Sequence, residues 1–168
     1  MSDLYASELG IKPRGVYWLV FDGYYLKLHR FQRVTQAWHA RSGSSGTKGV
    51  FDYTPARQTV KGGGPIPGGE YWIQAEELAA SPSSVEFWRS TWNEAAWGTQ
   101  RITIHPRPAT VTPGRSGFFI HGGDAWGSAG CIDLTYGMAS FAKAIQPLTD
   151  CHIPLKVDYS GTTLVPKP

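Results

Sequence analysis

Apolar and polar residues alternate along much of this 168-residue chain, which is the period-two pattern of strands with one buried face. The pattern is clearest over residues 16–30, where alternating apolar positions lie on both sides of Asp22-Gly23. Asp-Gly between two such runs is typical of a tight turn, so this segment is predicted to form a β-hairpin. The same patterns predict further strands at 34–40, 71–74, 101–105, 117–121 and 153–157.

Two segments carry apolar residues at helical spacing instead. Residues 83–97 begin with serines that can cap a helix, and their apolar stripe includes Trp88 and Trp92. Residues 135–145 place Phe141 on an apolar side. The sequence therefore predicts a mainly β fold with one or two short helices.

The chain has the length of one domain, and we expect residues 1–168 to form a single one. Residues 41–69 are rich in Gly, Ser and Pro, and this composition predicts one long loop that could act as a lid. The polar residues 161–168 are expected to be a frayed tail.

Charge and hydropathy exclude some classes of function. The net charge is +3, from 16 basic and 13 acidic residues, which is too mild for a nucleic-acid-binding protein. No apolar run approaches the roughly 18 residues of a membrane span, so no membrane insertion is expected. The first residues contain no basic start followed by an apolar stretch, which predicts a soluble protein made in the cytoplasm without a signal peptide.

Only two cysteines are present, Cys131 and Cys151, and a disulfide scaffold of this size would carry more. One bridge between them is an open alternative. We favour a free nucleophile at Cys131 and a structural role for Cys151. The five histidines are scattered without a recognisable ligand motif, so neither a metal nor another cofactor is expected.

The chemistry is concentrated between His121, which ends a predicted strand, and Cys131. An imidazole can accept a thiol proton and hold the thiolate in an ion pair, and the N-terminus of the predicted helix at 135–145 would favour that thiolate. Four of the nine residues between the two are Gly, which suits a close backbone approach to a substrate. Gly130 allows a tight turn, and backbone N–H groups around Cys131 would stabilise an oxyanion. The alternative to a catalytic pair is that Cys131 is a small core residue and that His121 has only a structural hydrogen bond.

The residues Ile120-His121-Gly122 and Ser128-Ala129-Gly130-Cys131-Ile132 resemble the signature of L,D-transpeptidases of the YkuD type. That signature is a His-Gly, a spacer, and then Ser/Thr-His-Gly-Cys. Residues 65–73 resemble the Thr-Pro-x-Gly-x-Phe/Tyr element of these enzymes, and residues 18–27 resemble their opening hairpin. The resemblance implies a mixed β-sandwich and a catalytic pair of Cys131 and His121.

Three departures from that signature are present. Ala129 replaces the histidine of Ser-His-Gly-Cys, the spacer is shorter, and Asp133 stands where many members carry Arg. With the small size and the missing signal peptide, they make the chain similar to Tlde1-type effectors of the type VI secretion system. That similarity implies removal of the terminal D-Ala from peptidoglycan tetrapeptide stems, and exchange of that D-Ala for another D-amino acid. It also implies type VI secretion components and an immunity protein as partners, with action in the periplasm of a target bacterium.

The resemblance also implies roles around the pair. The carbonyl of Gly122 would orient the imidazole of His121, although general triad logic leaves Asp124 as a rival. Ser128 would support the loop, or be a simple turn residue. Arg101 is a further candidate: it would bind a substrate carboxylate, or it would simply lie on a solvated face of its strand. Trp126 would form a wall of the substrate cleft, or it would pack in the core.

Two other functions remain open. One is a different cysteine peptidoglycan hydrolase, an endopeptidase or an amidase. Papain-like enzymes place Cys before His, however, and only His152 follows Cys131, at a short spacing. The other is a non-catalytic cell-wall-binding module, because seven Trp and eight Tyr would suit stacking on sugars.

Overall fold

A computed structural model describes residues 16–46, 48–80, 100–149 and 152–168. The predicted helix at 83–97 and Cys151 lie outside these residues. The strands are β1 (Tyr17–Phe21), β2 (Tyr25–Arg30), β3 (Arg33–His39), β4 (Arg41–Gly43), β5 (Val50–Asp52), β6 (Gly69–Gln74), β7 (Ala79–Ala80), β8 (Gln100–Pro106), β9 (Phe118–His121), β10 (Ser128–Asp133), β11 (His152–Val157) and β12 (Leu164–Pro166). The α-helices in this part of the chain are α2 (Pro55–Gln58) and α5 (Met138–Ile145), and the short 3-10 turns are η1 (Ala75–Glu77), η2 (Thr135–Gly137) and η3 (Gln146–Leu148).

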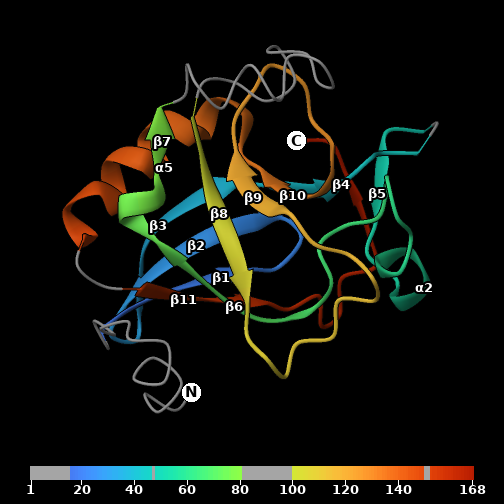
Figure 1. The fold of residues 1–168 in the computed structure, drawn as a ribbon. Helices are drawn as coiled ribbons and strands as arrows, with labels where there is room; N and C mark the ends of the chain where they lie inside the picture. Colours follow the sequence, from blue (N-terminus) through green and yellow to red (C-terminus); the bar gives the residue numbers. More distant parts are fainter. Residues whose placement is uncertain (1–15, 47, 81–99, 150–151) are drawn as a thin grey trace.

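Ten strands form one mixed sheet in the order β3-β2-β1-β11-β6-β8-β9-β10-β4, with β7 paired to β8. The pairs β1·β11 and β9·β10 are parallel, and the other pairs are antiparallel. Figure 1 shows β8 and β9 crossing in front of β1 and β2, so the sheet folds over itself and encloses a core. The prediction of a mainly β fold of L,D-transpeptidase type with short helices is confirmed.

The predicted hairpin is confirmed as β1 and β2, with Leu19 opposite Leu28. One carboxylate oxygen of Asp22 accepts the backbone N–H groups of Tyr24 and Tyr25 at 2.9 and 2.8 Å, which closes the turn. The other predicted strands correspond to β3, β6, β8, β9 and β11, and the predicted helix at 135–145 corresponds to η2 followed by α5.

The core contains the alternate side chains of these strands. The fully buried ones include Leu19, Phe21, Leu26, Tyr71, Ile73, Ile102, Ile120, Ile132, Ile153 and Leu155, with Phe141 from α5. Because successive side chains of a strand point to opposite faces, the residues between these positions on β8, β9 and β10 share the other face. The candidate site lies on that face. No helix among the described residues is both long enough and apolar enough to cross a bilayer.

The prediction that residues 41–69 form one long loop is wrong, because they contain β4, β5 and α2. Five successive carbonyl groups, those of residues 63–67, accept hydrogen bonds from side chains. The donors are Arg57 to Gly63, Arg115 to Gly64 and Pro65, Tyr159 to Ile66, and Tyr71 to Pro67, at 2.6–3.2 Å. A Cβ on Gly64 would lie 2.4 Å from the Arg57 carbonyl oxygen, so this glycine allows close packing.

The expectation of a frayed tail at 161–168 is also wrong. β12 pairs antiparallel with β5, and the Val165 side chain is fully buried. β12 could not be predicted, because it is only three residues long and contains Pro166, and proline is disfavoured within central strands.

Candidate active site

The structure brings His121 and Cys131 to one face of two neighbouring parallel strands. His121 is in register with Asp133, and Ile120 with Ile132. Cys131 lies two residues before Asp133 and therefore shares the face of Asp133 and His121. Both His121 and Cys131 are almost completely buried, at 0% and 1% exposure. Cys131 was expected just before the N-terminus of the helix predicted at 135–145, and it lies inside β10, four residues before the start of η2.

The orientation of the His121 ring is fixed by its own neighbour in the chain. Nδ1 lies 2.7 Å from the carbonyl oxygen of Gly122, and since a carbonyl only accepts, Nδ1 carries the proton and donates. Nε2 is then the nitrogen with the basic lone pair. Asp124, the rival for this position, is exposed, and the Gly122 carbonyl takes its place at Nδ1.

Gly122 can occupy its position only because it lacks a side chain. A Cβ there would lie 2.8 Å from the Cβ of Met138 and 2.9 Å from the carbonyl oxygen of Thr135. The His121 carbonyl accepts the backbone N–H of Leu134 at 2.9 Å. The turn after β10 is therefore packed tightly against the residue that orients the imidazole.

Burial shifts both the thiol and the imidazole toward their neutral forms. Burial raises the pKa of Cys131 to about 11, although hydrogen bonds from Ser128 and from the Phe119 backbone act in the opposite direction. Burial lowers the pKa of His121 to about 4, although the hydrogen bond to Gly122 opposes this. Burial therefore favours the neutral thiol and the neutral imidazole over a thiolate–imidazolium ion pair. The predicted help from a helix dipole is also not found, since α5 begins only at Met138.

Asp133 is a buried residue of this site that the sequence analysis noted only as a departure from a signature. Its two carboxylate oxygens accept the backbone N–H groups of Thr135 at 2.8 Å and Gly127 at 2.9 Å. These bonds tie together the loop before β10 and the turn after it. Burial raises the pKa of Asp133 to about 7, although both N–H groups lower it, and its charge raises the pKa of Cys131.

Arg115 is a second residue that the sequence analysis missed, because it lies in a polar loop without a motif. Its guanidinium donates to the carbonyl oxygens of Gln58, Gly64 and Pro65 at 2.6–2.7 Å and lies over the Phe118 ring. Its positive charge lowers the pKa of Cys131. This side chain therefore connects the 58–65 segment to the strand that carries the cysteine.

Gly130 lies between Arg115 and Cys131 with a φ of +76°, a conformation that glycine adopts without strain. A Cβ there would lie 2.8 Å from a terminal nitrogen of Arg115. The Gly130 N–H donates to the Gly64 carbonyl oxygen at 2.9 Å. Of the backbone N–H groups around Cys131 that were expected to stabilise an oxyanion, that of Gly130 is therefore already bonded to the 58–65 segment.

The remaining predicted site residues are distributed around this pair. Arg101 lies directly opposite His121 on the neighbouring strand β8, over the Phe119 ring, and interacts electrostatically with Cys131. Ser128 is buried and lies close enough to Cys131 to lower the pKa of its thiol. Trp126 packs against the core, with the Arg41 guanidinium over its ring.

No group of three or more His, Cys, Asp or Glu side chains is arranged to hold a metal ion within the residues that the structure describes.

Comparisons with known proteins give a family and a fold. The family model described as the Tlde1 domain matches residues 39–153. No curated protein matches the sequence.

Among solved structures, the chain is similar to Bdellovibrio bacteriovorus Bd1075, with a TM-score of 0.53 and 15% identity over 90% of this chain and 49% of that one. It is also similar to the helical cell shape determining protein Pgp2 from Campylobacter jejuni, with a TM-score of 0.50 and 17% identity over 92% and 54% of the two chains. An L,D-transpeptidase from Mycobacterium smegmatis has a TM-score of 0.45 and 16% identity, over 85% of this chain and 58% of that one. The chain thus spans about half the length of these solved proteins, and the likeness to Bd1075 and to Pgp2 shows the fold.

Proposed function

Because the chain belongs to the Tlde1 domain family, we propose that it is a peptidoglycan-modifying enzyme that works through a thioester on Cys131. Its reactions are the removal of the terminal D-Ala that follows meso-diaminopimelate in tetrapeptide stems, and the exchange of that D-Ala for another D-amino acid. The resemblance of residues 120–132 to L,D-transpeptidases supports this assignment, and so does the fold shared with a cell shape determining protein.

One observation carries the proposal. His121 and Cys131 lie on one face of paired strands, and the Gly122 carbonyl holds the proton on Nδ1. This leaves Nε2 as the acceptor for the thiol proton. His121 can act as a general base only in the tautomer that carries its proton on Nδ1, because Nε2 must be free to accept a proton. A buried thiol such as that of Cys131 needs a base of this kind to become nucleophilic.

The reaction begins from the neutral pair. As the sulfur of Cys131 attacks the carbonyl of the L-centre of meso-diaminopimelate, its proton passes to Nε2 of His121. The tetrahedral intermediate collapses to a thioester, the carbon–nitrogen bond to D-Ala breaks, and His121 protonates the leaving amine. Water or the amine of another D-amino acid then attacks the thioester, His121 takes the proton of that nucleophile, and the sulfur leaves as a thiol with the proton returned.

Arg101 supplies positive charge on the same face. A guanidinium binds a carboxylate through two parallel hydrogen bonds, and the leaving D-Ala carries a free carboxylate. We assign Arg101 to that group, because it lies opposite His121 and interacts electrostatically with Cys131. Arg101→Ala should raise KM more than it lowers kcat.

The biological setting follows from the family. We propose delivery by a type VI secretion system into the periplasm of a target bacterium. The producing cell is protected by an immunity protein of its own. Expression directed to the periplasm should shorten tetrapeptide stems and impair growth, and Cys131→Ala should do neither.

The enzymatic proposal is tested with purified disaccharide-tetrapeptide and mass spectrometry of the products. Wild type should release one D-Ala, whereas Cys131→Ala and His121→Ala should leave the tetrapeptide intact. His39→Ala is the matched control, because this exposed histidine lies on β3 beside Tyr25, outside the strands β8, β9 and β10 that carry the site, and it should keep full activity. Near wild-type turnover by either site variant would overturn the mechanism, and cleavage of a cross-link or of the lactyl amide would indicate an endopeptidase or an amidase instead.

A further inference from the structure

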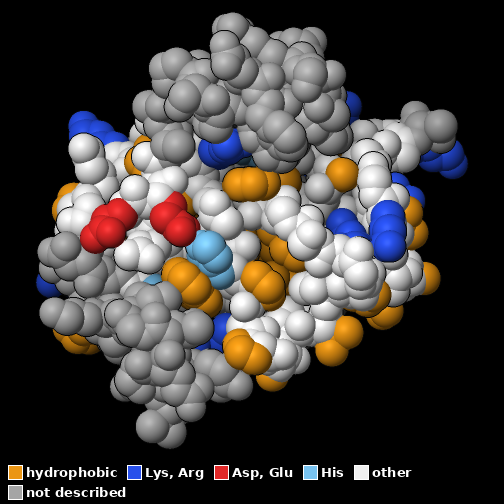
Figure 2. Space-filling view, in the orientation of Figure 1, with side chains coloured by type: hydrophobic (Ala, Val, Ile, Leu, Met, Phe, Trp, Pro, Cys, Tyr) orange, Lys and Arg blue, Asp and Glu red, His pale blue; other side chains and the backbone are white. Residues whose placement is uncertain are grey.

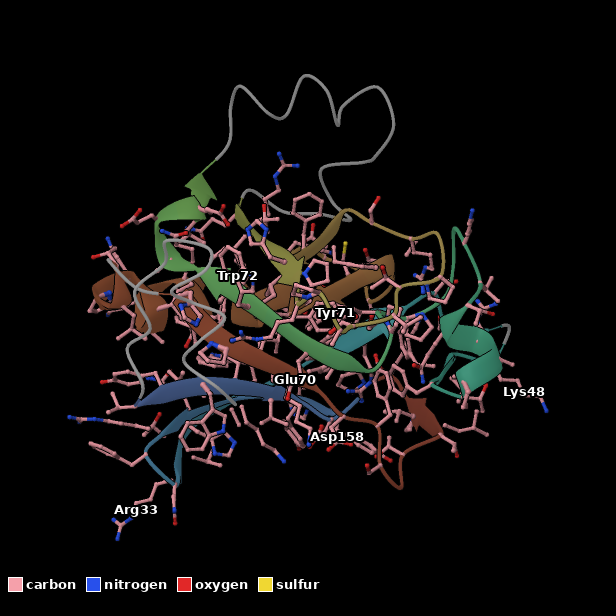
Figure 3. All side chains as sticks on the ribbon, turned by 60° about the horizontal axis from the view of Figure 1, so that its bottom comes forward. Arg33, Lys48, Glu70, Tyr71, Trp72 and Asp158 are labelled. Carbon is pink, nitrogen blue, oxygen red and sulfur yellow. The ribbon has the colours of Figure 1, made fainter. Side chains whose placement is uncertain are left out.

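An aromatic and acidic group lies along the same sheet, outside the catalytic pair. Trp72 on β6 is directly opposite His105 on β8, and the two rings stack with centroids 4.1 Å apart and planes 18° apart. His105 Nε2 lies 2.6 Å from a carboxylate oxygen of Glu77 in η1. The His105 and Glu77 side chains are 30% and 37% exposed. Figure 2 shows histidine and acidic side chains exposed next to hydrophobic groups on one face of the molecule, and Figure 3 labels Trp72 on β6.

This group shares a face with the candidate site. Arg101 and His105 are four residues apart on β8, so both side chains point to the same side of the strand, and Arg101 is opposite His121. The register of β9 and β10 pairs Ile132 with Ile120, so its continuation by one residue brings Cys131 level with Phe119, which is opposite Thr103. His105 is therefore two strands across and two residues along from Cys131, or about 12 Å away.

The spacing matches the proposed substrate. Three stem residues separate the carbonyl that Cys131 attacks from the sugar to which the stem is attached, and three extended residues span about 10 Å. With the D-Ala carboxylate on Arg101 and the scissile carbonyl at Cys131, a stem that runs along β8 places its sugar end at Trp72 and His105.

The chemistry of the group also matches a sugar. The apolar C–H face of a pyranose packs on an aromatic ring, and its hydroxyls and acetamide need a few fixed polar partners. Trp72 supplies the ring, and Glu77 and His105 supply an acceptor and a donor that hold one another in place.

We propose that Trp72, His105 and Glu77 form a subsite for the N-acetylated amino sugar that carries the stem peptide. This proposal rests on the proposed function, and it makes the enzyme selective for stems still attached to glycan. Trp18 offers an internal comparison, because it stacks on His29 with centroids 5.1 Å apart and planes 12° apart, on the separate hairpin β1–β2.

The test compares kcat and KM on two substrates, the free tetrapeptide and the same tetrapeptide attached to its disaccharide. Trp72→Ala should raise KM for the disaccharide substrate about three- to tenfold, as expected for loss of one stacking contact, and leave KM for the free tetrapeptide unchanged. Glu77→Gln should also raise KM for the disaccharide substrate, and Trp18→Ala should change KM for neither substrate.

Equal effects of Trp72→Ala on both substrates, or none on either, would overturn the subsite. Turnover of the free tetrapeptide by Trp72→Ala reports that the variant is folded. If wild type turns over neither substrate, the proposed function fails instead, so the two failures are distinguishable.

Discussion

Gly130→Ala is a substitution whose effect can be worked out from two separate contributions. The residue has a φ of +76°, and a side chain there costs about 1–2 kcal/mol in backbone strain. The added Cβ would also meet a terminal nitrogen of Arg115 at 2.8 Å, so the guanidinium must move. Losing one of its hydrogen bonds to a carbonyl costs about 1.5–3 kcal/mol more, which makes the expected destabilisation about 2.5–5 kcal/mol in all.

Gly62→Ala is the matched control. Gly62 has the same φ of +76°, but nothing lies within 4 Å of the position that a Cβ would take. Gly62→Ala should therefore lower the free energy of unfolding only by the cost of backbone strain, about 1–2 kcal/mol.

The assay is urea unfolding of both variants, together with turnover of the tetrapeptide substrate. Gly130→Ala should be the less stable of the two, and it should lose most activity, because a displacement of about 1 Å at a nucleophile can cost about a hundredfold in rate. Equal destabilisation by the two substitutions, or wild-type turnover by Gly130→Ala, would refute the account of Arg115 and Gly130.

Three further outcomes are expected. Since burial lowers the pKa of His121 to about 4, the acidic limb of kcat/KM should lie well below pH 6.5, and a limb at 6.5 would show an exposed base. The same group contributes stability that is lost as the pH falls from about 6.5 through 4. Burial raises the pKa of Asp133 to about 7, so its contribution to stability is present at low pH and is lost as the pH rises from about 4 through 7. Asp133→Asn should flatten that decline in urea titrations at pH 5 and 8, and an unchanged pH dependence would contradict the assignment. Val165→Ala should lower the free energy of unfolding by about 1–3 kcal/mol, because this side chain is fully buried. A change near zero would indicate that residues 161–168 are frayed after all.

Most of the strands could be predicted because their alternation is a local property of the chain. The hairpin around Asp22-Gly23 needs only its own residues to form a turn. β10 has no such pattern, because Ser128, Gly130, Cys131, Ile132 and Asp133 are all buried and no alternation remains. β12 and β4 are three residues long, and only their partners make them strands.

The candidate pair could be predicted because the His-Gly and Ser-x-Gly-Cys residues lie close together in the sequence. Its electrostatics could not, because the pKa values of His121 and Cys131 depend on burial by distant elements. Arg115 was missed for a related reason. Its three hydrogen-bond partners lie 50 to 57 residues earlier in the chain, in a segment whose glycines were taken as a sign of looseness. Those glycines instead allow backbones to approach closely.

The central claim is a covalent thioester between the shortened stem and Cys131. Mass spectrometry of the intact protein, quenched within the first turnovers, measures it directly. We expect wild type to gain the mass of the tripeptide acyl group, the adduct to map to the peptide containing Cys131, and hydroxylamine to remove it. Steady release of D-Ala without any adduct, or an adduct on another residue, would contradict it.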